Sequence, residues 1–91
     1  MTILIEREHG FSHEHITQVS ELIAQQLVDE YGVLWQWQDN RLMIKHSSAN
    51  GYLESMDGKL IIKLSLGFTA SFFSSAIESE ICQQLDKLLV A

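Results

Sequence analysis

Three histidines near the N-terminus, His9, His13 and His15, are close enough in sequence to be considered as metal ligands. Zinc and other transition metals bind imidazole nitrogens, so such a group could hold an ion. The spacing is unfavourable, because residues two apart on a helix point to different sides, whereas residues four apart share a face. We therefore expect a polar helix start in this segment, with no metal and no other cofactor.

His46 is the candidate general base of the chain. The strand register described below places it on the apolar face of a sheet, opposite Ser55 and near Ser48. The sequence forces no acidic residue beside it, and a histidine that hydrogen-bonds to a hydroxyl, a carbonyl or water is the commoner arrangement. Cys82 has no nearby cation to stabilise its thiolate and no visible base, which nucleophilic catalysis requires. We expect no catalytic residues and a protein that is not an enzyme.

Two further motifs have both a structural and a functional interpretation. Trp35 and Trp37 could stack on bases or sugars, but their alternation places both in the core-facing row of a strand, so we expect them to pack in the core. The serine-rich segment FTASFFSSAIES, residues 68–79, lacks the glycines and the lysine of a phosphate-binding loop. We interpret it as a helix start that is capped by Thr69 or Ser71.

The composition is that of a small acidic globular chain. Its 91 residues are enough for one domain, residues 1–91, and a hydrophobic content of 46% excludes disorder. A net charge of −6 argues against nucleic acid and anionic membranes as partners, because both are bound through clustered cations. The apolar runs are too short for a transmembrane segment, and the first residues do not resemble a signal peptide. Because a single cysteine allows no internal disulfide, we expect a cytoplasmic location.

The elements that position these residues begin with a strand over Thr2–Arg7, where β-branched and longer residues alternate. An amphipathic helix is predicted from His13 to Tyr31, with Ser12 as its N-cap and Gly32 as its left-handed C-cap. Its apolar residues recur every three or four positions and form one stripe, which we expect to face the core. The stripe consists of Ile16, Val19, Ile23, Leu27 and Tyr31.

Three dipeptides in the middle of the chain predict tight hairpin turns, because Asn, Asp and Gly tolerate positive φ. They are Asp39-Asn40, Asn50-Gly51 and Asp57-Gly58. The first turn sets Trp37 opposite Leu42 and Trp35 opposite Ile44; the second sets Ser48 opposite Leu53 and His46 opposite Ser55; the third sets Ser55 opposite Leu60 and Leu53 opposite Ile62. All three registers place one set of residues on the same face: Val33, Trp35, Trp37, Leu42, Ile44, Leu53, Leu60, Ile62, Leu64 and Leu66. We predict a four-stranded antiparallel meander, because a one-residue slip would scramble that face.

A second helix, from about Ser71 to Leu89, is predicted to complete the chain. Its expected buried stripe consists of Phe73, Ile77, Ile81, Leu85 and Leu88. The predicted order is β-α-β-β-β-β-α, an α+β fold in which the meander and the N-terminal strand form an antiparallel sheet and both helices cover one face. This order matches the TATA-binding-protein-like and helix-grip architectures, although likeness of fold carries no function with it.

Apolar residues outside the core define a candidate interaction surface. The open face of the sheet is expected to carry Leu34, Met43, Tyr52, Met56 and Ile61, enough to form a patch among polar neighbours. Phe72 falls off the buried stripe of its helix and lies close in sequence to Phe68. Two interpretations remain open: both phenylalanines tuck under the sheet edge, or both stay exposed and join the interaction surface. In the second case we expect a homodimer with Phe72 near its interface.

Several short motifs are shared, in order and spacing, with a known family. They are IEREH at 5–9, Tyr31-Gly32 at a helix end, Trp37 before the first turn, Gly51, Leu66-Gly67-Phe68 and IESEI at 77–81. Nearly end to end, the chain resembles the polyhydroxyalkanoic acid system family, small bacterial proteins also described as polyhydroxyalkanoate granule-region proteins. The resemblance implies a link to polyester storage granules. It transfers no catalytic or binding residue, because the family defines none.

Three functions of different classes follow from these observations. The first is a non-enzymatic accessory protein that acts through apolar contacts with a granule, a granule-associated protein or a second copy of itself. The second is a small carrier of an apolar ligand between the sheet and the C-terminal helix, for which we would expect a cavity of about 300 Å³ or more. An enzyme that uses His46 is the third and the least favoured.

Overall fold

Five antiparallel strands and three helices make up the structure, a computed structural model that describes residues 1–56 and 58–89. The elements are β1 (Thr2–Glu8), α1 (His13–Tyr31), β2 (Leu34–Gln38), β3 (Arg41–His46), β4 (Ala49–Met56), β5 (Lys59–Leu66), α2 (Phe68–Ser71) and α3 (Ser74–Leu88). The predicted α+β class and the predicted order of strands and helices are confirmed, with one additional short helix, α2.

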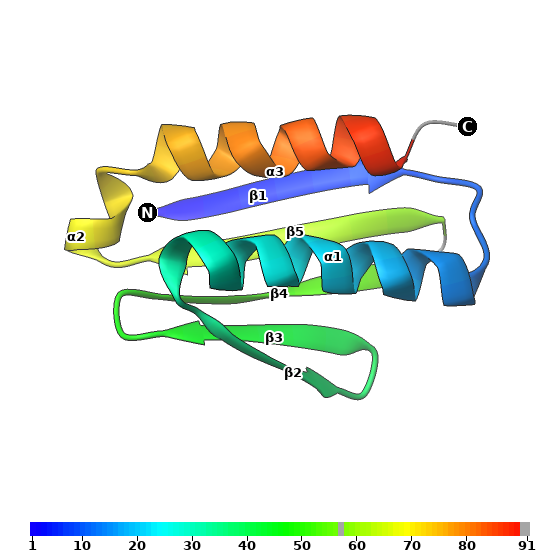
Figure 1. Ribbon diagram of the computed structural model, residues 1–91, viewed down its shortest axis with the longest axis horizontal. Coiled ribbons are helices and arrows are strands. Elements are labelled where there is room, and N and C mark those ends of the chain that lie inside the picture. Colours follow the sequence, from blue (N-terminus) through cyan, green and yellow to red (C-terminus); the bar gives the residue numbers. More distant parts are fainter. Residues whose placement is uncertain (57, 90–91) are drawn as a thin grey trace.

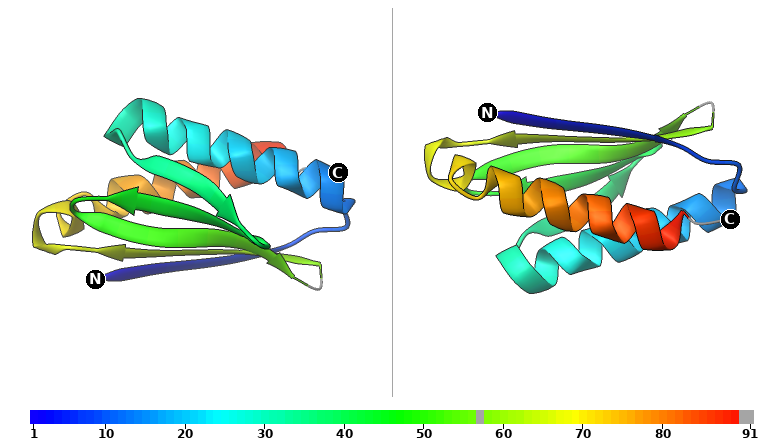
Figure 2. Two further views of the ribbon diagram at one scale, coloured as in Figure 1. Left: turned by 90° about the horizontal axis from the view of Figure 1, so that it is seen from below. Right: turned by 90° about the horizontal axis from the view of Figure 1, so that it is seen from above.

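The strands form one sheet in the order β1-β5-β4-β3-β2. Strand β1 pairs with β5, so the N-terminus lies beside the end of the meander, where the Met1 ammonium donates a hydrogen bond to the Leu66 carbonyl oxygen at 3.0 Å. Helices α1 and α3 both lie on one side of the sheet and leave the other side uncovered (Figures 1 and 2). The predicted arrangement, with the long helices on a single face, is therefore confirmed.

Helix α1 begins and ends where the sequence predicts. The Ser12 hydroxyl accepts a hydrogen bond from the His15 amide at 3.2 Å, which satisfies one of the free amides of the first turn. At the other end Gly32 adopts a left-handed φ of 69° and donates to the Val28 carbonyl oxygen. The predicted stripe is buried up to Leu27, and Tyr31 is half-buried.

The first and third hairpins have the predicted register, whereas the second does not. Trp37 lies opposite Leu42, and Leu53 lies opposite Ile62. Asp57 of the third turn lies outside the described residues. The second turn falls at residues 47–48, so Asn50-Gly51 lies inside β4, and Leu53 pairs with Leu42 instead of Ser48. The pairing has moved by an even number of residues, which keeps every side chain on its predicted face.

The helix-covered face of the sheet is the core that the registers predict. Eight of the ten predicted residues are buried: Val33, Leu42, Ile44, Leu53, Leu60, Ile62, Leu64 and Leu66. Trp35 is half-buried and packs against them. Trp37 is 37% exposed at the margin of this face, where its indole N–H donates to the Glu21 carboxylate on α1 at 2.7 Å. Both indoles thus lie on the covered side of the sheet, as predicted.

The C-terminal helix is divided in two, which corrects the prediction of one helix from Ser71 to Leu89. Phe73, with φ −104° and ψ 9°, leaves helical geometry between α2 and α3. As a consequence Phe73 drops out of the predicted buried stripe, while Ile77, Ile81 and Leu85 stay buried. Neither Thr69 nor Ser71 caps a helix, and the Ser71 hydroxyl donates to the Phe68 carbonyl oxygen at 2.6 Å. Within the described residues, no helix is both long and apolar enough to cross a membrane.

Candidate functional site

Three phenylalanines at one end of the molecule form the most prominent apolar surface of the described chain. Phe68, Phe72 and Phe73, here called the aromatic lobe, are 82%, 74% and 56% exposed. The rings of Phe68 and Phe72 meet edge to face, with centroids 5.3 Å apart and planes at 79°. The interpretation that Phe68 and Phe72 tuck under the sheet edge is therefore wrong.

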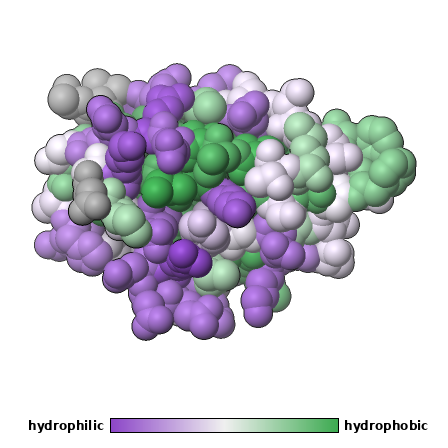
Figure 3. Space-filling model, turned by 180° about the vertical axis from the view of Figure 1, so that it is seen from behind, coloured by the Kyte–Doolittle hydropathy of each residue, from purple (hydrophilic) through white to green (hydrophobic). Residues whose placement is uncertain are grey.

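The short helix α2 holds the lobe away from the core. Gly67 precedes it and donates a backbone hydrogen bond to the Ser48 carbonyl oxygen at 2.7 Å, which ties α2 to the turn between β3 and β4. The Ser71 amide donates to the Gly67 carbonyl oxygen at 2.9 Å and closes the helical turn. Figure 1 shows α2 projecting beyond the end of the sheet, and Figure 3 shows a hydrophobic lobe at the corresponding end of the space-filling surface.

An apolar pocket of about 200 Å³ lies next to the lobe, between the sheet, the end of α1 and the start of α3. Phe73 lines this pocket as well, so the pocket and the aromatic lobe are continuous. Its other lining residues are mostly apolar and come from α1, the strands and both C-terminal helices: Leu27, Tyr31, Val33, Ile44, His46, Ser48, Ala49, Leu64, Leu66, Thr69, Ala70 and Ile77.

The open face of the sheet carries the other predicted interaction residues: Leu34, Met43, Tyr52, Met56 and Ile61. Met43 and Tyr52 are direct cross-strand neighbours. Leu34 lies opposite Lys45 and Met56 lies opposite Lys59, so charged side chains separate the apolar ones. Leu4 on β1 is a further exposed apolar residue of this face and was not among the predicted interaction residues. Figure 3 shows a hydrophobic area in the upper middle of this side, with hydrophilic atoms around and below it.

The N-terminal histidines interact with protein groups rather than with each other as a cluster. The Phe11 amide donates to His9 Nδ1 at 3.3 Å, so Nε2 carries the proton and donates to the Ser55 hydroxyl at 3.2 Å. The ring of Phe11 also stacks on His15, with centroids 4.4 Å apart. In residues 1–56 and 58–89, no three His, Cys, Asp or Glu side chains are grouped as metal ligands. That the protein binds no metal tightly stays a prediction.

His46 lies in a different environment from the predicted one. It pairs with Ala49 across the turn, it is exposed, and its Nδ1 accepts a hydrogen bond from the Ser48 amide at 3.1 Å. Ser55, its predicted neighbour, is bonded to His9 instead. The predicted pairing of His46 with Ser55 is wrong because it depended on the Asn50-Gly51 turn.

Cys82 has a cation beside it, contrary to the expectation from the sequence. Arg7 on β1 reaches across to α3 and forms a salt bridge with Asp86 at 2.8 Å. The hydrogen bond with Asp86 raises the pKa of Arg7, partial burial opposes this shift, and Cys82 adds a smaller increase. The contact joins residues at opposite ends of the chain, so sequence spacing gave no signal for it.

Two carboxylates from different helices meet at the end of α1. The Tyr31 hydroxyl donates to Glu80 on α3 at 3.1 Å, and Gln26 donates to Glu30 at 2.6 Å. Hydrogen bonding with Glu80 favours the protonated form of Glu30 and raises its pKa, and burial and the nearby charge of Glu80 raise it further. Burial, followed by the hydrogen bond to Glu80, raises the pKa of Tyr31 to about 12.

Together, the fold and its exposed end define a small α+β protein with an exposed apolar surface at one end. A family model described as "putative polyhydroxyalkanoic acid system protein" matches residues 3–89, and the chain belongs to this family. No curated protein and no solved structure matches the chain. The likeness to TATA-binding-protein-like and helix-grip folds therefore stays a prediction.

Proposed function

We propose that the chain is a non-enzymatic accessory protein of the polyhydroxyalkanoic acid system, in the bacterial cytoplasm, and that its working surface is the aromatic lobe. The observation that carries the proposal is the exposure of Phe68, Phe72 and Phe73 within six consecutive residues. The description of the family names a polyester, and the apolar surface of such a polymer is therefore the partner that we propose for the lobe.

The physical argument rests on the free energy of burying the lobe. Covering one exposed phenylalanine contributes about 1.5–3 kcal/mol, so Phe68 and Phe72 together supply a substantial driving force for adsorption. The net charge of −6 opposes approach only to a similarly charged surface. The rings project from a short helix whose preceding residue, Gly67, is tied to the β3–β4 turn by one backbone hydrogen bond, so the lobe is anchored at its base.

Co-sedimentation with polyhydroxybutyrate particles tests this proposal. The wild type is expected to pellet with the particles, and the double variant Phe68→Ser/Phe72→Ser to stay in the supernatant. Leu22→Ser is the matched control, because Leu22 is also exposed and apolar but lies on α1, away from the lobe. Equal pelleting of the lobe variant and the wild type, with circular dichroism showing both folded, would refute the proposal.

The apolar pocket supports a second candidate function, a carrier of a small apolar ligand. Its position between the sheet and the C-terminal helices is where such a ligand was expected. Its volume of about 200 Å³ is below the expected 300 Å³, so the occupant would be a short alkyl chain or an apolar end group. Native mass spectrometry of the purified protein tests this function, since a bound ligand adds a discrete mass that Ala70→Phe, by filling the pocket, should abolish.

A further inference from the structure

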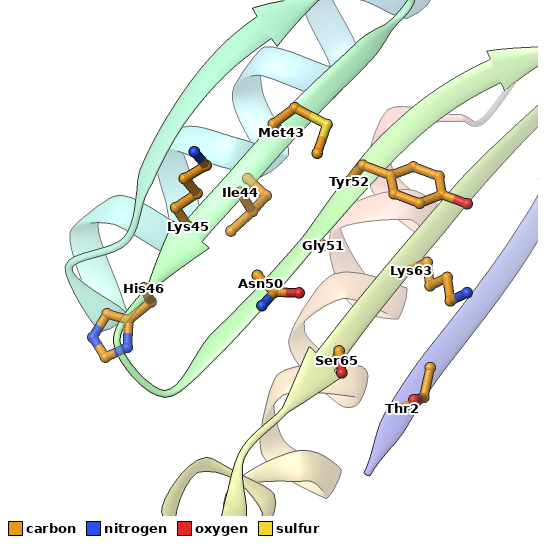
Figure 4. A pocket seen from close by; sticks show the side chains of 10 residues that line it. All are labelled: Thr2, Met43, Ile44, Lys45, His46, Asn50, Gly51, Tyr52, Lys63 and Ser65. Atoms are coloured by element: carbon orange, nitrogen blue, oxygen red, sulfur yellow. The ribbon is translucent and has the colours of Figure 1, made fainter.

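The open face of the sheet contains a depression whose chemistry differs from that of the aromatic lobe. It has a volume of about 630 Å³, within the range of small-molecule sites, and lies over β3, β4 and β5 with the start of β1 at its side. Figure 4 shows Asn50 on the central strand, with Lys45 on one neighbouring strand and Lys63 and Ser65 on the other. This depression and the apolar pocket are on opposite faces of the sheet.

The strand register places hydrogen-bonding side chains in one row across four strands. Thr2 lies opposite Ser65, Ser65 opposite Asn50, and Asn50 opposite Lys45. Directly opposed side chains of antiparallel strands have Cβ atoms about 4.5–5.5 Å apart, so these groups can act on one ligand. Lys63 lies in the adjacent row, opposite Tyr52. The row therefore offers an amide, two hydroxyls and an ammonium group, with a second ammonium beside it.

The charge of the depression is uncompensated within the described residues. Its lining contains no carboxylate, and neither Lys45 nor Lys63 forms a salt bridge in residues 1–56 and 58–89. Glu54, two residues beyond Tyr52 on β4, is bound by Arg41 at 2.9 Å. The Arg41 guanidinium in turn lies 4.4 Å over the Tyr52 ring, which holds that ion pair at the side of the depression.

The positive charge of this depression contrasts with the negative net charge of the whole chain. The chain has only six basic residues against twelve acidic ones, so its overall field repels small anions. A general excess of basic residues therefore does not explain why two unpaired lysines share this concave surface. Lysine ammonium groups bind carboxylates and phosphates alike as compact charges, and the neighbouring hydroxyls and amide can donate to the remaining oxygens.

We infer that this depression binds a small polyanion with at least two negative groups, either carboxylates or phosphates. Lys45 and Lys63 come from β3 and β5, which lie two strand spacings apart, about 10 Å across the sheet. One negative group would meet Lys45 and Asn50, and the other would meet Lys63. Ser65 and Thr2 would donate to oxygens between them. This site is independent of the aromatic lobe.

Titration by NMR with citrate and, separately, with pyrophosphate tests the inference, against potassium chloride at the same ionic strength. Saturable shifts at residues of the depression are expected at millimolar anion. Saturation with citrate alone would identify the ligand class as carboxylates, and saturation with pyrophosphate alone would identify it as phosphates. Saturation with both would mean that negative charge, which the two anions share, determines binding. The absence of saturable shifts with either anion would overturn the inference.

Variants separate a built site from general electrostatics. Lys45→Met and Lys63→Met are each expected to weaken binding by about three- to tenfold, which is the usual effect of removing one exposed charge that hydrogen-bonds to a ligand. Lys59→Met is the matched control, because Lys59 lies on the same strand and face as Lys63, at the other end of the sheet. Equal weakening by all three variants would contradict the site. Phe68→Ser/Phe72→Ser should leave anion binding unchanged, so either proposal can fail without the other.

Discussion

At the scale of single residues, Gly51 has no room for a side chain. A Cβ atom there would overlap the Lys63 carbonyl oxygen and lie 2.8 Å from Leu64 Cα, both backbone atoms of the paired strand. A glycine inside a strand commonly marks such a close approach of two backbones. The residue thus allows β4 and β5 to pair closely under the open-face depression.

Gly51→Ala is therefore expected to lower the free energy of unfolding by at least about 1–3 kcal/mol, the usual cost of overpacking. Denaturant unfolding measures this difference. Gly10→Ala is the control, because a Cβ at Gly10 would meet nothing within 4 Å and should change stability little. An unchanged free energy of unfolding in Gly51→Ala as well as in Gly10→Ala would contradict the close approach of β4 and β5.

The same residue marks a limit of prediction from sequence. An Asn-Gly pair is a strong hairpin signal, yet here it lies within β4. Alternation of apolar residues could not correct the error, because a shift by an even number of residues leaves the same side chains facing the core. The core face was therefore predictable, whereas the neighbours of His46 and Ser55 were not. Contacts such as Arg7 with Asp86 depend on packing between distant segments and left no local pattern.

At the scale of elements, Glu30 at the end of α1 lies close to Glu80 in the middle of α3. The pKa of Glu30 is raised above its unfolded value by Glu80, so this pair contributes stability below the unfolded pKa and loses it as pH rises through the folded pKa. At neutral pH the two charges repel. The prediction is that Glu80→Gln raises the melting temperature at pH 7 and reduces the loss of stability between acidic and neutral pH.

Thermal unfolding from pH 4 to pH 7 tests this expectation. Glutamine at this position can still accept the Tyr31 hydrogen bond, so the change isolates the charge. Glu78→Gln is the control for net charge, because it removes an exposed carboxylate from the same helix. A rise of the same size in both variants would mean that overall charge, and not the Glu30–Glu80 pair, is responsible.

The C-terminal helices show why element type was easier to predict than element boundaries. Ile77, Ile81 and Leu85 recur at helical spacing and are buried, as expected. The break at Phe73 has no glycine or proline to signal it. Because the helix breaks at this residue, Phe73 lies outside the core and joins Phe68 and Phe72 in the aromatic lobe. The most exposed part of the candidate site was thus only partly predictable.

At the scale of the whole molecule, the aromatic lobe is a surface that a second copy could cover. Burying Phe68 and Phe72 of each subunit contributes about 1.5–3 kcal/mol per ring, and repulsion between subunits is screened over a Debye length of about 8 Å at physiological salt. We predict a homodimer with Phe72 near its interface. Sedimentation velocity should show a dimer at micromolar concentration that becomes a folded monomer in Phe72→Asp. A monomeric wild type, or a dimer that persists in the variant, would contradict this prediction.

The binding surfaces are properties of the assembled fold. The sequence predicted the α+β class and the single covered face, because hydrophobic periodicity encodes both. The open-face depression requires β1 to add to β5, which places Thr2 in the same row as Ser65 and Asn50. The apolar pocket requires α1, the strands and α3 to leave a space between them. Neither surface is visible in any one segment.

Hydrogen–deuterium exchange is the measurement that tests the central claim, that the aromatic lobe is the association surface, most directly. Helix α2 is a single exposed turn, so its amides should exchange rapidly in dilute free protein. In the dimer, or on polyhydroxybutyrate particles, we predict slower exchange that is concentrated in residues 68–73. Bound protein whose exchange is unchanged there, or is slowed only in β3, β4 and β5, would contradict the claim.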